Sequence, residues 1–573
     1  LNYGTGLVTE HKQRTQLAKL NLIATRKARS AIAYQAAREY AKIGLSLLGE
    51  NAWQNQYEIS LAFHDLAAEL ASLCGNFEEM EQFVETVITN ARSLIEKVNV
   101  YRIKIISNVS GNKLTEAITI GLQLLQQFGV TFPETPTAEE IQRSIAEIEE
   151  LIGDREIEDL INLPIMTDGE KIAIKQIANS ITAAAYISGL PLAPLLICLS
   201  VKLSIQYGNT EASASPYVAY AMIYCNILKD VETGVKFGNL ALELASKLDA
   251  RDAKAEVLNI VGFYILHRKS HIKKTLPFAQ EGYGVGLEVG NLEFAGYNAN
   301  VFCYNSFWCG KSLETLEQET RAYCNGLLQL NQLTAANWCR IYWQSILNLL
   351  GVAEHPSILS GEALQEAEFL PQLIKAHDNG GLFYFNLYKL ILCFLFGEFA
   401  SAQNHAVEVR RYLVASAGGV GEAAFYFYDS LVALAALNQQ SEQTSELLER
   451  VEDNQTQLQQ YRAKYAPMNY QHKVDLVAAE KCRILGQFAE AMELYDKAIS
   501  GAKANEYIQE EALANELAAK FYLHKNKEKF AAVHMQDAYY CYARWGAGAK
   551  TKDLEKRYPQ LLAPILHTQR QGI

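Results

Sequence analysis

The feature that most constrains this chain is a long succession of amphipathic segments of helix length, separated by short turns. Apolar residues recur three and four positions apart almost everywhere, and no stretch alternates apolar and polar residues for long enough to form a strand. Turn signals between these segments stand at Gly75-Asn76, Gly111-Asn112, Lys229-Asp230, Gly310-Lys311, Gly397-Glu398 and Gly486-Gln487. This spacing predicts an all-α protein built from helix, turn, helix units.

One unit near the end of the chain shows the expected geometry in detail. Small Ala479 precedes a turn at Gly486, and Phe488, Tyr495 and Ala498 follow it. Small residues let two antiparallel helices approach closely, glycine supplies the positive φ of the turn, and the aromatic rings fill the gap to the next pair. These are positions of the tetratricopeptide (TPR) type, so we expect a TPR-like α-solenoid, a right-handed superhelix of antiparallel helix pairs.

Two irregular stretches subdivide this solenoid. Thr131–Thr137 contains prolines and precedes an acidic run, and Ala353–Gly361 interrupts the helical pattern a second time. Within one continuous solenoid we therefore expect N-terminal repeats over 1–130, an irregular helical insert over 131–210, central repeats over 211–355 and C-terminal repeats over 356–573.

Charge and cysteine spacing narrow the class of protein. The formal net charge is -12, from 52 basic and 64 acidic residues, which disfavours nucleic acid as the main partner. The ten cysteines show no Cys-x-x-Cys spacing and lie in apolar stretches, as reduced buried thiols do, so we expect a cytoplasmic protein. The first residue, Leu1, and the absence of an apolar leader after it favour a segment of a longer protein.

One apolar stretch is long enough to cross a bilayer. Ile181 to Val201 contains no charged residue, but Pro191 and Pro194 lie in its middle, after Ser188 and a glycine. Because proline interrupts a helix, two short buried helices fit this stretch better than one membrane span. We therefore expect no membrane association.

Sequence motifs for catalysis are missing. The glycines of Gly418-Gly419-Val420-Gly421 are not followed by the Lys and hydroxyl residue that hold phosphate and magnesium, so a turn between helices explains them better. The chain has no G-x-S-x-G elbow, no H-E-x-x-H and no kinase catalytic loop. We expect a protein without enzymatic activity, without a cofactor and without a bound metal.

A basic stretch, HRKSHIKK, contains His267 and His271 four residues apart. On one helix two such imidazoles could face a metal, but basic residues surround them and no carboxylate completes a ligand set. The stretch is a candidate anion-binding patch, although most such clusters are solvated surface; its basic members are Arg268, Lys269, Lys273 and Lys274.

Aromatic residues concentrate between Tyr297 and Trp343, where three of the five tryptophans lie. Tyr and Trp offer large apolar contacts with a polar tip, which suits recognition of a ligand or a partner. The candidate binding residues are Tyr304, Trp308, Trp338, Tyr342 and Trp343. An aromatic stripe at helical spacing more often packs between helices, so a core role is the alternative.

Both ends of the chain resemble one protein family. The start, LNYGTGLVTEHKQRTQLAKLNLIATRKARS, the middle stretch SIQYGNTEASASPYVAYAMIYC and the end, MQDAYYCYARWGAGAK followed by DLEKRYPQLL, resemble the helical region of large cyanobacterial multi-sensor signalling kinases. In that family a serine/threonine kinase and an ATPase of the signal-transduction NTPase type precede the region, and a GAF sensor domain and a histidine kinase follow it. None of the family's catalytic motifs occurs in this sequence.

The resemblance implies a regulatory arm that couples an ATPase switch to sensor and kinase modules. The leading hypothesis is a protein-interaction arm whose concave face holds a partner protein or a neighbouring domain of the same polypeptide. The alternative is a sensing module that binds a small-molecule inducer in an aromatic-lined groove. A preformed pocket with converging polar groups would favour the second hypothesis, and a smooth packed layer would favour the first.

Overall fold

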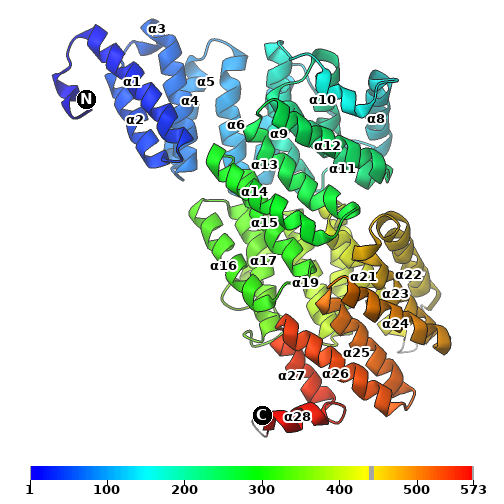
Figure 1. The fold of residues 1–573 in the computed structure, drawn as a ribbon. Coiled ribbons are helices and arrows are strands. Elements are labelled where there is room, and N and C mark those ends of the chain that lie inside the picture. Colours follow the sequence, from blue (N-terminus) through cyan, green and yellow to red (C-terminus); the bar gives the residue numbers. More distant parts are fainter. Residues whose placement is uncertain (1, 438–443, 571–573) are drawn as a thin grey trace.

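The computed structural model describes residues 2–437 and 444–570, and these residues are almost entirely helical (Figure 1). Within them no β-strand occurs, and the only sheet-like contacts are two isolated bridges, Ile165 with Asn209 and Ser360 with Gln365. The predicted all-α, solenoid-like fold is confirmed. The TPR assignment, the handedness of the superhelix and the boundaries at 131, 211 and 356 stay predictions.

The first half of the chain contains fourteen α-helices among its described residues: α1 (His11–Ser30), α2 (Tyr34–Leu47), α3 (Ala52–Asn55), α4 (Tyr57–Leu73), α5 (Phe77–Asn90), α6 (Leu94–Ser110), α7 (Leu114–Gln127), α8 (Ala138–Ile152), α9 (Gly169–Ile187), α10 (Leu192–Tyr207), α11 (Ala214–Ile223), α12 (Val231–Lys247), α13 (Arg251–Ile260) and α14 (Thr275–Val289). Helices α11 and α13 each continue into a π-helical turn, at Tyr224–Leu228 and Val261–Ile265.

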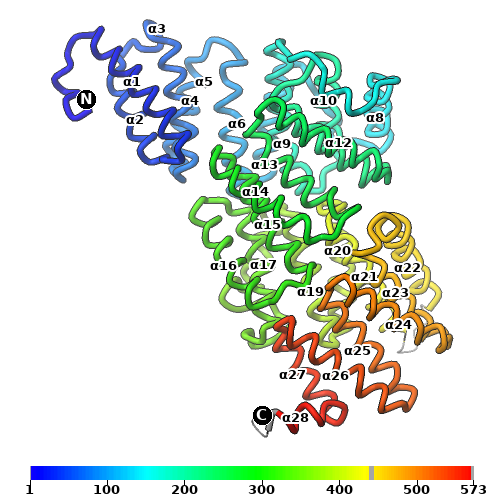
Figure 2. Tube along the Cα trace, in the orientation of Figure 1, coloured from blue at the N-terminus to red at the C-terminus, as the bar shows by residue number. Residues whose placement is uncertain are grey.

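The second half continues with α15 (Leu292–Trp308), α16 (Leu313–Gln329), α17 (Leu333–Leu350), α18 (Glu366–Lys375), α19 (Asn379–Leu395), α20 (Phe399–Tyr412), α21 (Val420–Leu437), α22 (Thr444–Leu458), α23 (Pro467–Ile484), α24 (Phe488–Ala504), α25 (Ile508–His524), α26 (Glu528–Trp545), α27 (Gly548–Arg557) and α28 (Ala563–Arg570). The backbone trace runs from α1 at one end of the elongated molecule to α28 at the other (Figure 2).

All six predicted turns lie between consecutive helices. Each contains a residue with positive φ, which ends one helix and lets the chain reverse: Gly75, Asn112, Lys229, Gly310, Gly397 and Gly486. Consecutive helices joined by these turns pack against each other, as in α4 with α5, α19 with α20 and α23 with α24. The apolar stretch from Ile181 to Val201 likewise forms two helices, α9 and α10, separated at Gly189, so the predicted buried hairpin is confirmed.

The helices form an inner and an outer layer that differ in burial. In α15, α17 and α19 nearly every residue is buried, whereas α16, α20 and α24 bury only one stripe. A helix that is apolar on all sides needs protein on all sides. The inner helices therefore require a cover on the face that a simple solenoid leaves open.

That cover comes from the chain itself, about 200 residues away in sequence. Thr334 Oγ1 donates a hydrogen bond to the carbonyl of Val109 at 2.6 Å, and Asn379 Nδ2 donates to the carbonyl of Ser188 at 2.8 Å. Toward the C-terminus, Asn469 Nδ2 donates to the His267 carbonyl at 3.0 Å, and Gln509 Nε2 to the Trp308 carbonyl at 2.8 Å. Each turn of the solenoid thus lies against the next one, and the inner face is filled.

Helix α21 is the one helix among the described residues that is long and apolar enough to span a membrane by composition. In the folded chain 83% of its apolar window is buried against other helices. A core helix of this layered fold passes the same test, so this observation is weak support for a membrane span.

In the glycine stretch at 418–421, Gly418 and Gly419 form the turn before α21, in agreement with the prediction of a turn between helices, and Gly421 lies in the first turn of α21. Gly418 has φ +94°, and a Cβ atom on Gly421 would overlap the hydroxyl of Tyr304. The stretch therefore serves close packing of α21 against α15. Glycine is required there because no side chain fits between the two helices.

We expect Gly421→Ala to destabilise the protein by about 1–3 kcal/mol, because the added methyl group overpacks the contact with Tyr304. The measurement is the free energy of unfolding in denaturant. Adding Tyr304→Phe should restore part of the loss, since it removes the atom nearest the new methyl group. Gly284→Ala is the matched control, because nothing lies within 4 Å of a Cβ on this α14 residue. Equal stability of the two alanine variants would contradict this account of the turn.

Candidate functional site

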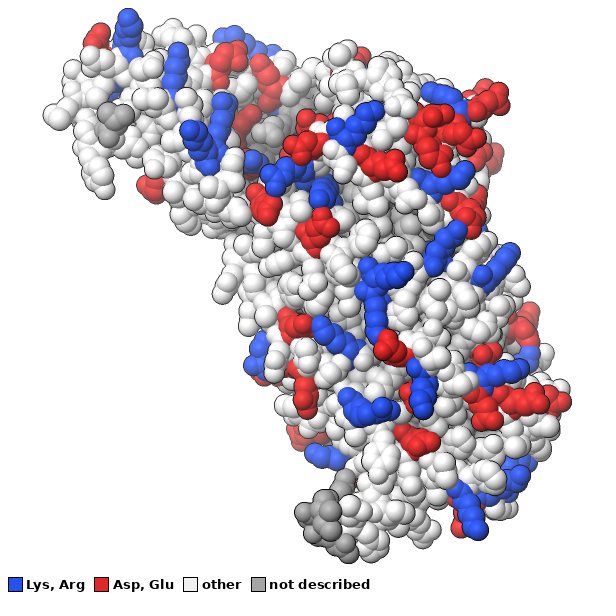
Figure 3. Space-filling view, in the orientation of Figure 1, with Lys and Arg blue, Asp and Glu red and all other residues white. Residues whose placement is uncertain are grey.

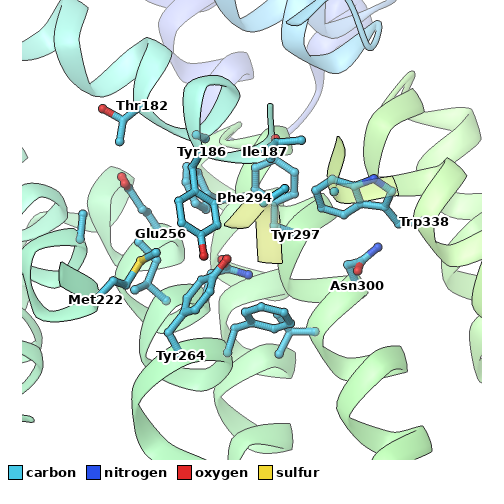
Figure 4. Close-up of a pocket in the computed structure, with 18 of the residues that line it drawn as sticks. Thr182, Tyr186, Ile187, Met222, Glu256, Tyr264, Phe294, Tyr297, Asn300 and Trp338 are labelled. Carbon is cyan, nitrogen blue, oxygen red and sulfur yellow. The ribbon is translucent and has the colours of Figure 1, made fainter. Parts of the chain in front are cut away.

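A cavity of about 90 Å³ lies where the inner helices of one solenoid turn meet those of the next. Helices α9, α11, α13, α15, α17 and α19 all contribute to its lining. In Figure 4, Thr182 and Glu256 lie at one side of the pocket and Trp338 and Asn300 at the other, with Tyr186 and Tyr264 between them. Thr182, Ala183 and Phe294 are partly exposed, so this end of the cavity reaches solvent.

Aromatic rings make most of the wall. Tyr297 stacks on Trp338 with ring centroids 5.6 Å apart, and Phe294 meets Tyr297 edge to face at 5.3 Å. Tyr186 and Tyr264 form a second edge-to-face pair at 5.6 Å. Tyr264 lies in the π-helical turn after α13, a kind of irregularity that often occurs at functional sites. These contacts hold the rings in place around a preformed space.

The position of Trp338 depends on the start of α19. Asp378 is the N-cap of this helix and accepts a hydrogen bond from the backbone N–H of Gly381 at 2.7 Å. The same carboxylate accepts a hydrogen bond from the Trp338 indole N–H at 3.0 Å. A capping residue therefore fixes the indole ring at the floor of the cavity.

Several polar groups at the cavity have no partner in the protein. Asn259 lies three residues after Glu256 on α13, and its Nδ2 donor makes no hydrogen bond among the described residues. The Tyr297 hydroxyl and Oε1 of the adjacent Glu293 are likewise unpaired and buried. Buried polar atoms are normally satisfied, so unpaired groups beside a cavity suggest a site for a ligand or for water. Asn300 differs, because it donates to the Ala335 carbonyl and accepts from the Tyr342 hydroxyl.

Two carboxyl groups near the cavity have raised pKa values. Burial raises the pKa of Glu293 to about 8, the negative charge of Glu256 adds to the effect, and the neighbouring Tyr297 hydroxyl opposes it. Burial also raises the pKa of Glu256 to about 7, against a lowering contribution from Ser215. Glu293 is therefore mostly protonated near neutral pH in the folded protein, and Glu256 is about half protonated.

The raised pKa of Glu293 links stability to pH. In the unfolded chain a glutamate ionises near pH 4.3, so the folded state loses stability as pH rises from there through about 8. We expect Glu293→Gln to gain stability over wild type as pH rises, reaching about 2–4 kcal/mol at pH 8.5 and little at pH 4.5. Denaturant melts across this pH range measure the difference.

Glu281→Gln is the control for this pH series, because Glu281 is an exposed α14 residue paired with Lys254. Its stability difference from wild type should not change with pH above 5.5. A difference that is equally flat for Glu293→Gln would show that Glu293 is already ionised in the folded state.

The five predicted aromatic binding residues do not all lie at one site in the structure. Trp338 lines the cavity. Tyr304, Trp308 and Tyr342 are buried among other rings of the inner layer, and the indole N–H of Trp343 donates to Glu317 at 2.8 Å. The binding role predicted for these five residues stays a prediction, and the cavity offers it a location only at Trp338.

Most lining residues were missed from the sequence, since they come from segments that looked like ordinary core. Tyr384, Tyr186 and Tyr264 all lie outside the segment from Tyr297 to Trp343 in which aromatic residues concentrate. One signal was present: Glu256 stands in α13 amid apolar and small residues. A carboxylate in such a position needs a partner or a raised pKa.

The predicted anion patch is dispersed by the fold. Arg268 is buried and donates hydrogen bonds to Asn226 Oδ1 at 2.6 Å and to the Gly418 carbonyl. Lys269 forms an ion pair with Glu232, Lys273 forms one with Glu506, and Lys274 is exposed. Basic and acidic side chains alternate over much of the visible face in Figure 3. Anion binding by this patch stays a prediction, with two of its four cations already paired.

His267 lies in a short 3-10 turn, Leu266–Arg268, and His271 is the N-cap of a second one, Ile272–Lys274. The two histidines are therefore not on one helix. Nδ1 of His267 is hydrogen-bonded to the Tyr470 hydroxyl at 2.8 Å, and Nε2 of His271 is 2.9 Å from the Asn505 carbonyl. Both histidines join one solenoid turn to the next. Among residues 2–437 and 444–570, no group of three or more His, Cys, Asp or Glu side chains is placed to hold a metal ion.

We expect Trp308→Ala to cost about 3–5 kcal/mol in the free energy of unfolding, because the ring is buried against Tyr304, Phe307 and Tyr388. Trp53→Ala, at a half-buried site in the N-terminal arm, should cost clearly less. A Trp308→Ala variant that melts like wild type would show that this ring faces a groove instead of the core.

Comparison with known proteins gives one relative. No family model matches the chain. Over 362 residues, 57% of this chain, the sequence is 20% identical to hybrid signal transduction histidine kinase G of Dictyostelium discoideum. The matched stretch covers 10% of that protein, so this chain corresponds to a small part of its length. The similarity is a distant one to a signal transduction kinase.

Proposed function

We propose that this chain is a non-catalytic regulatory segment of a multidomain signalling protein, and that it senses a small molecule in the cavity between its solenoid turns. The observation that carries the proposal is the preformed aromatic cavity with converging, unpaired polar groups. Such a pocket favours the small-molecule hypothesis over a smooth packed inner face.

The position of the cavity suggests how binding is transmitted. Helices α9, α11 and α13 line the cavity together with α17 and α19, which follow later in the chain. A ligand that fits between them stabilises the closed stack by RT ln(1 + [L]/Kd), about 2.7 kcal/mol at a hundred times Kd. Occupancy would shift the balance between closed and loosened stacking.

The signalling context rests on the distant similarity to a histidine kinase and on the resemblance to multi-sensor kinases. In this proposal the segment is cytoplasmic, joins an ATPase switch to sensor and kinase modules, and leaves phosphotransfer to other domains of the polypeptide. It binds neither nucleic acid nor membrane. The composition and the absent motifs described above support these expectations.

A protein-interaction role has a separate observation in its favour. Rings of Phe488, Phe521, Tyr522 and Phe530 contact one another in series along α24, α25 and α26, and Phe530 is 58% exposed. Phe521 and Tyr522 are buried, and Phe488 and Phe530 are exposed at the two ends of the series, so these two rings are the better place for a neighbouring domain than the filled inner face. They lie in the C-terminal part of the solenoid, the side on which the resemblance implies a sensor domain.

To test the ligand-sensing proposal, the wild-type chain is screened by thermal unfolding against a library of small metabolites. We expect at least one compound to raise Tm, because binding to the folded state alone stabilises it. Ala183→Phe should abolish the shift, since the added ring at the partly exposed end blocks the cavity.

Ala504→Phe is the matched control, since Ala504 is an exposed residue at the end of α24. It should leave the shift unchanged. Stabilising compounds that act equally on the Ala183→Phe variant would bind elsewhere, and the cavity would lose its assigned role.

A further inference from the structure

We propose that the cavity between the solenoid turns selects a small organic ammonium ion that also carries an oxygen acceptor. This inference rests on the proposed ligand-sensing function and names the chemical class of its ligand. It follows from the charge, the aromatic wall, the unpaired donor and the size of the cavity.

The first observation is a contrast between two sets of buried carboxylates. In the C-terminal half, Arg462 pairs with Glu422 at 2.6 Å, Lys473 with Glu510 at 2.6 Å, and Lys550 with Glu516 at 2.9 Å. These cations hold the pKa of each carboxyl below its usual range, despite burial. Buried carboxylates in this fold are therefore normally supplied with a cation.

The carboxyls at the cavity lack such a partner. No ion pair involves Glu256 or Glu293 among the described residues, and neither Lys nor Arg lines the cavity. The two basic residues of α13, which both precede Glu256, pair with other carboxylates: Arg251 with Glu288, and Lys254 with Glu281. Glu293 lies outside the lining, and Asp378 beneath Trp338 already accepts hydrogen bonds from the Trp338 indole and the Gly381 backbone. Glu256 is therefore the lining carboxyl group of the cavity, and it has no cation of the protein beside it among the described residues.

The aromatic wall is the second observation. Faces and edges of Tyr186, Tyr264, Phe294, Tyr297 and Trp338 surround the space. An ammonium group near such rings gains from the negative potential of the ring faces, and gains most when it is desolvated. A neutral apolar ligand would gain burial from the same rings but nothing from the carboxyls.

The unpaired donor specifies a further feature of the ligand. Nδ2 of Asn259 is buried and has no acceptor, and Asn259 stands one helical turn from Glu256. A ligand oxygen next to the ammonium group would satisfy this N–H donor. Anionic ligands are disfavoured, because the acidic side chain of Glu256 lines the cavity and, among the described residues, neither Lys nor Arg does so.

Size limits the group that fits inside. A cavity of 150 Å³ takes benzene, with six heavy atoms, so the 90 Å³ available here suits a group of about four. A trimethylammonium group has this size. The remainder of the ligand would extend toward Thr182 and Ala183, at the partly exposed end.

Choline and its neutral isostere 3,3-dimethyl-1-butanol are the matched probes, because they differ mainly in charge. Binding of each to the full 573-residue chain is measured by calorimetry. We expect choline to bind at least tenfold more tightly than the alcohol. Glu256→Gln should weaken choline at least tenfold and leave the alcohol unchanged, while Glu281→Gln should affect neither probe.

Each outcome decides one question. Equal or tighter binding of the alcohol, lost in Ala183→Phe, would overturn the cation preference and leave the ligand cavity standing. Choline binding that survives both Glu256→Gln and Glu293→Gln would also overturn it, since both carboxyls would then be irrelevant. If neither choline nor the alcohol binds, the inference is overturned. If no library compound is blocked by Ala183→Phe either, the proposed function falls with it.

Discussion

The structure depends on one constraint, the need of its inner helices for protein contacts on every side. Helices α15, α17 and α19 present apolar residues around their whole circumference, and their paired outer helices cover only part of it. The missing cover is the neighbouring turn of the same solenoid, held by hydrogen bonds between residues about 200 positions apart, such as Thr334 with Val109 and Gln509 with Trp308. An extended, open rod would expose this surface to water, at a cost proportional to its apolar area. Closure of the turns on each other is therefore part of folding.

Packing of the solenoid turns against each other also determines which polar groups the interior can hold. Between stacked turns, water is excluded and an ionised group needs a partner. The C-terminal half meets this requirement with ion pairs such as Arg462 with Glu422 and Lys550 with Glu516. The cavity region does not, since Glu256 and Glu293 form no ion pair among the described residues and burial raises the pKa of both carboxyl groups. In the proposed function, the unpaired Glu256 carboxyl group at the cavity faces the ligand.

The local pattern of the chain predicted the helices and their turns, because a turn depends on one or two residues such as Gly486 and a helix on its own apolar period. It did not predict that distant turns stack, because that contact joins residues about 200 positions apart and leaves only an indirect mark, the apolar composition all round α19. The candidate site shares this limit. The predicted binding residues include Trp338, which lines the cavity, whereas Tyr186 and Tyr264 reach the cavity from other segments of the chain. Tyr304 and Trp308 have the same spacing as Trp338 and Tyr342, yet the neighbouring turn covers them completely.

The cavity lies at the contact between helices that closes the fold, and its unpaired carboxyl group lies there too. It lies where helices from successive turns fail to fill the space between them, so the contacts that close the solenoid are incomplete at that point. A ligand that supplies the missing contacts and the missing charge adds to the same interaction that stabilises the whole stack. In the proposed function, a segment built in this way does not need a separate hinge, because the surface that closes the fold is also the surface that the ligand completes.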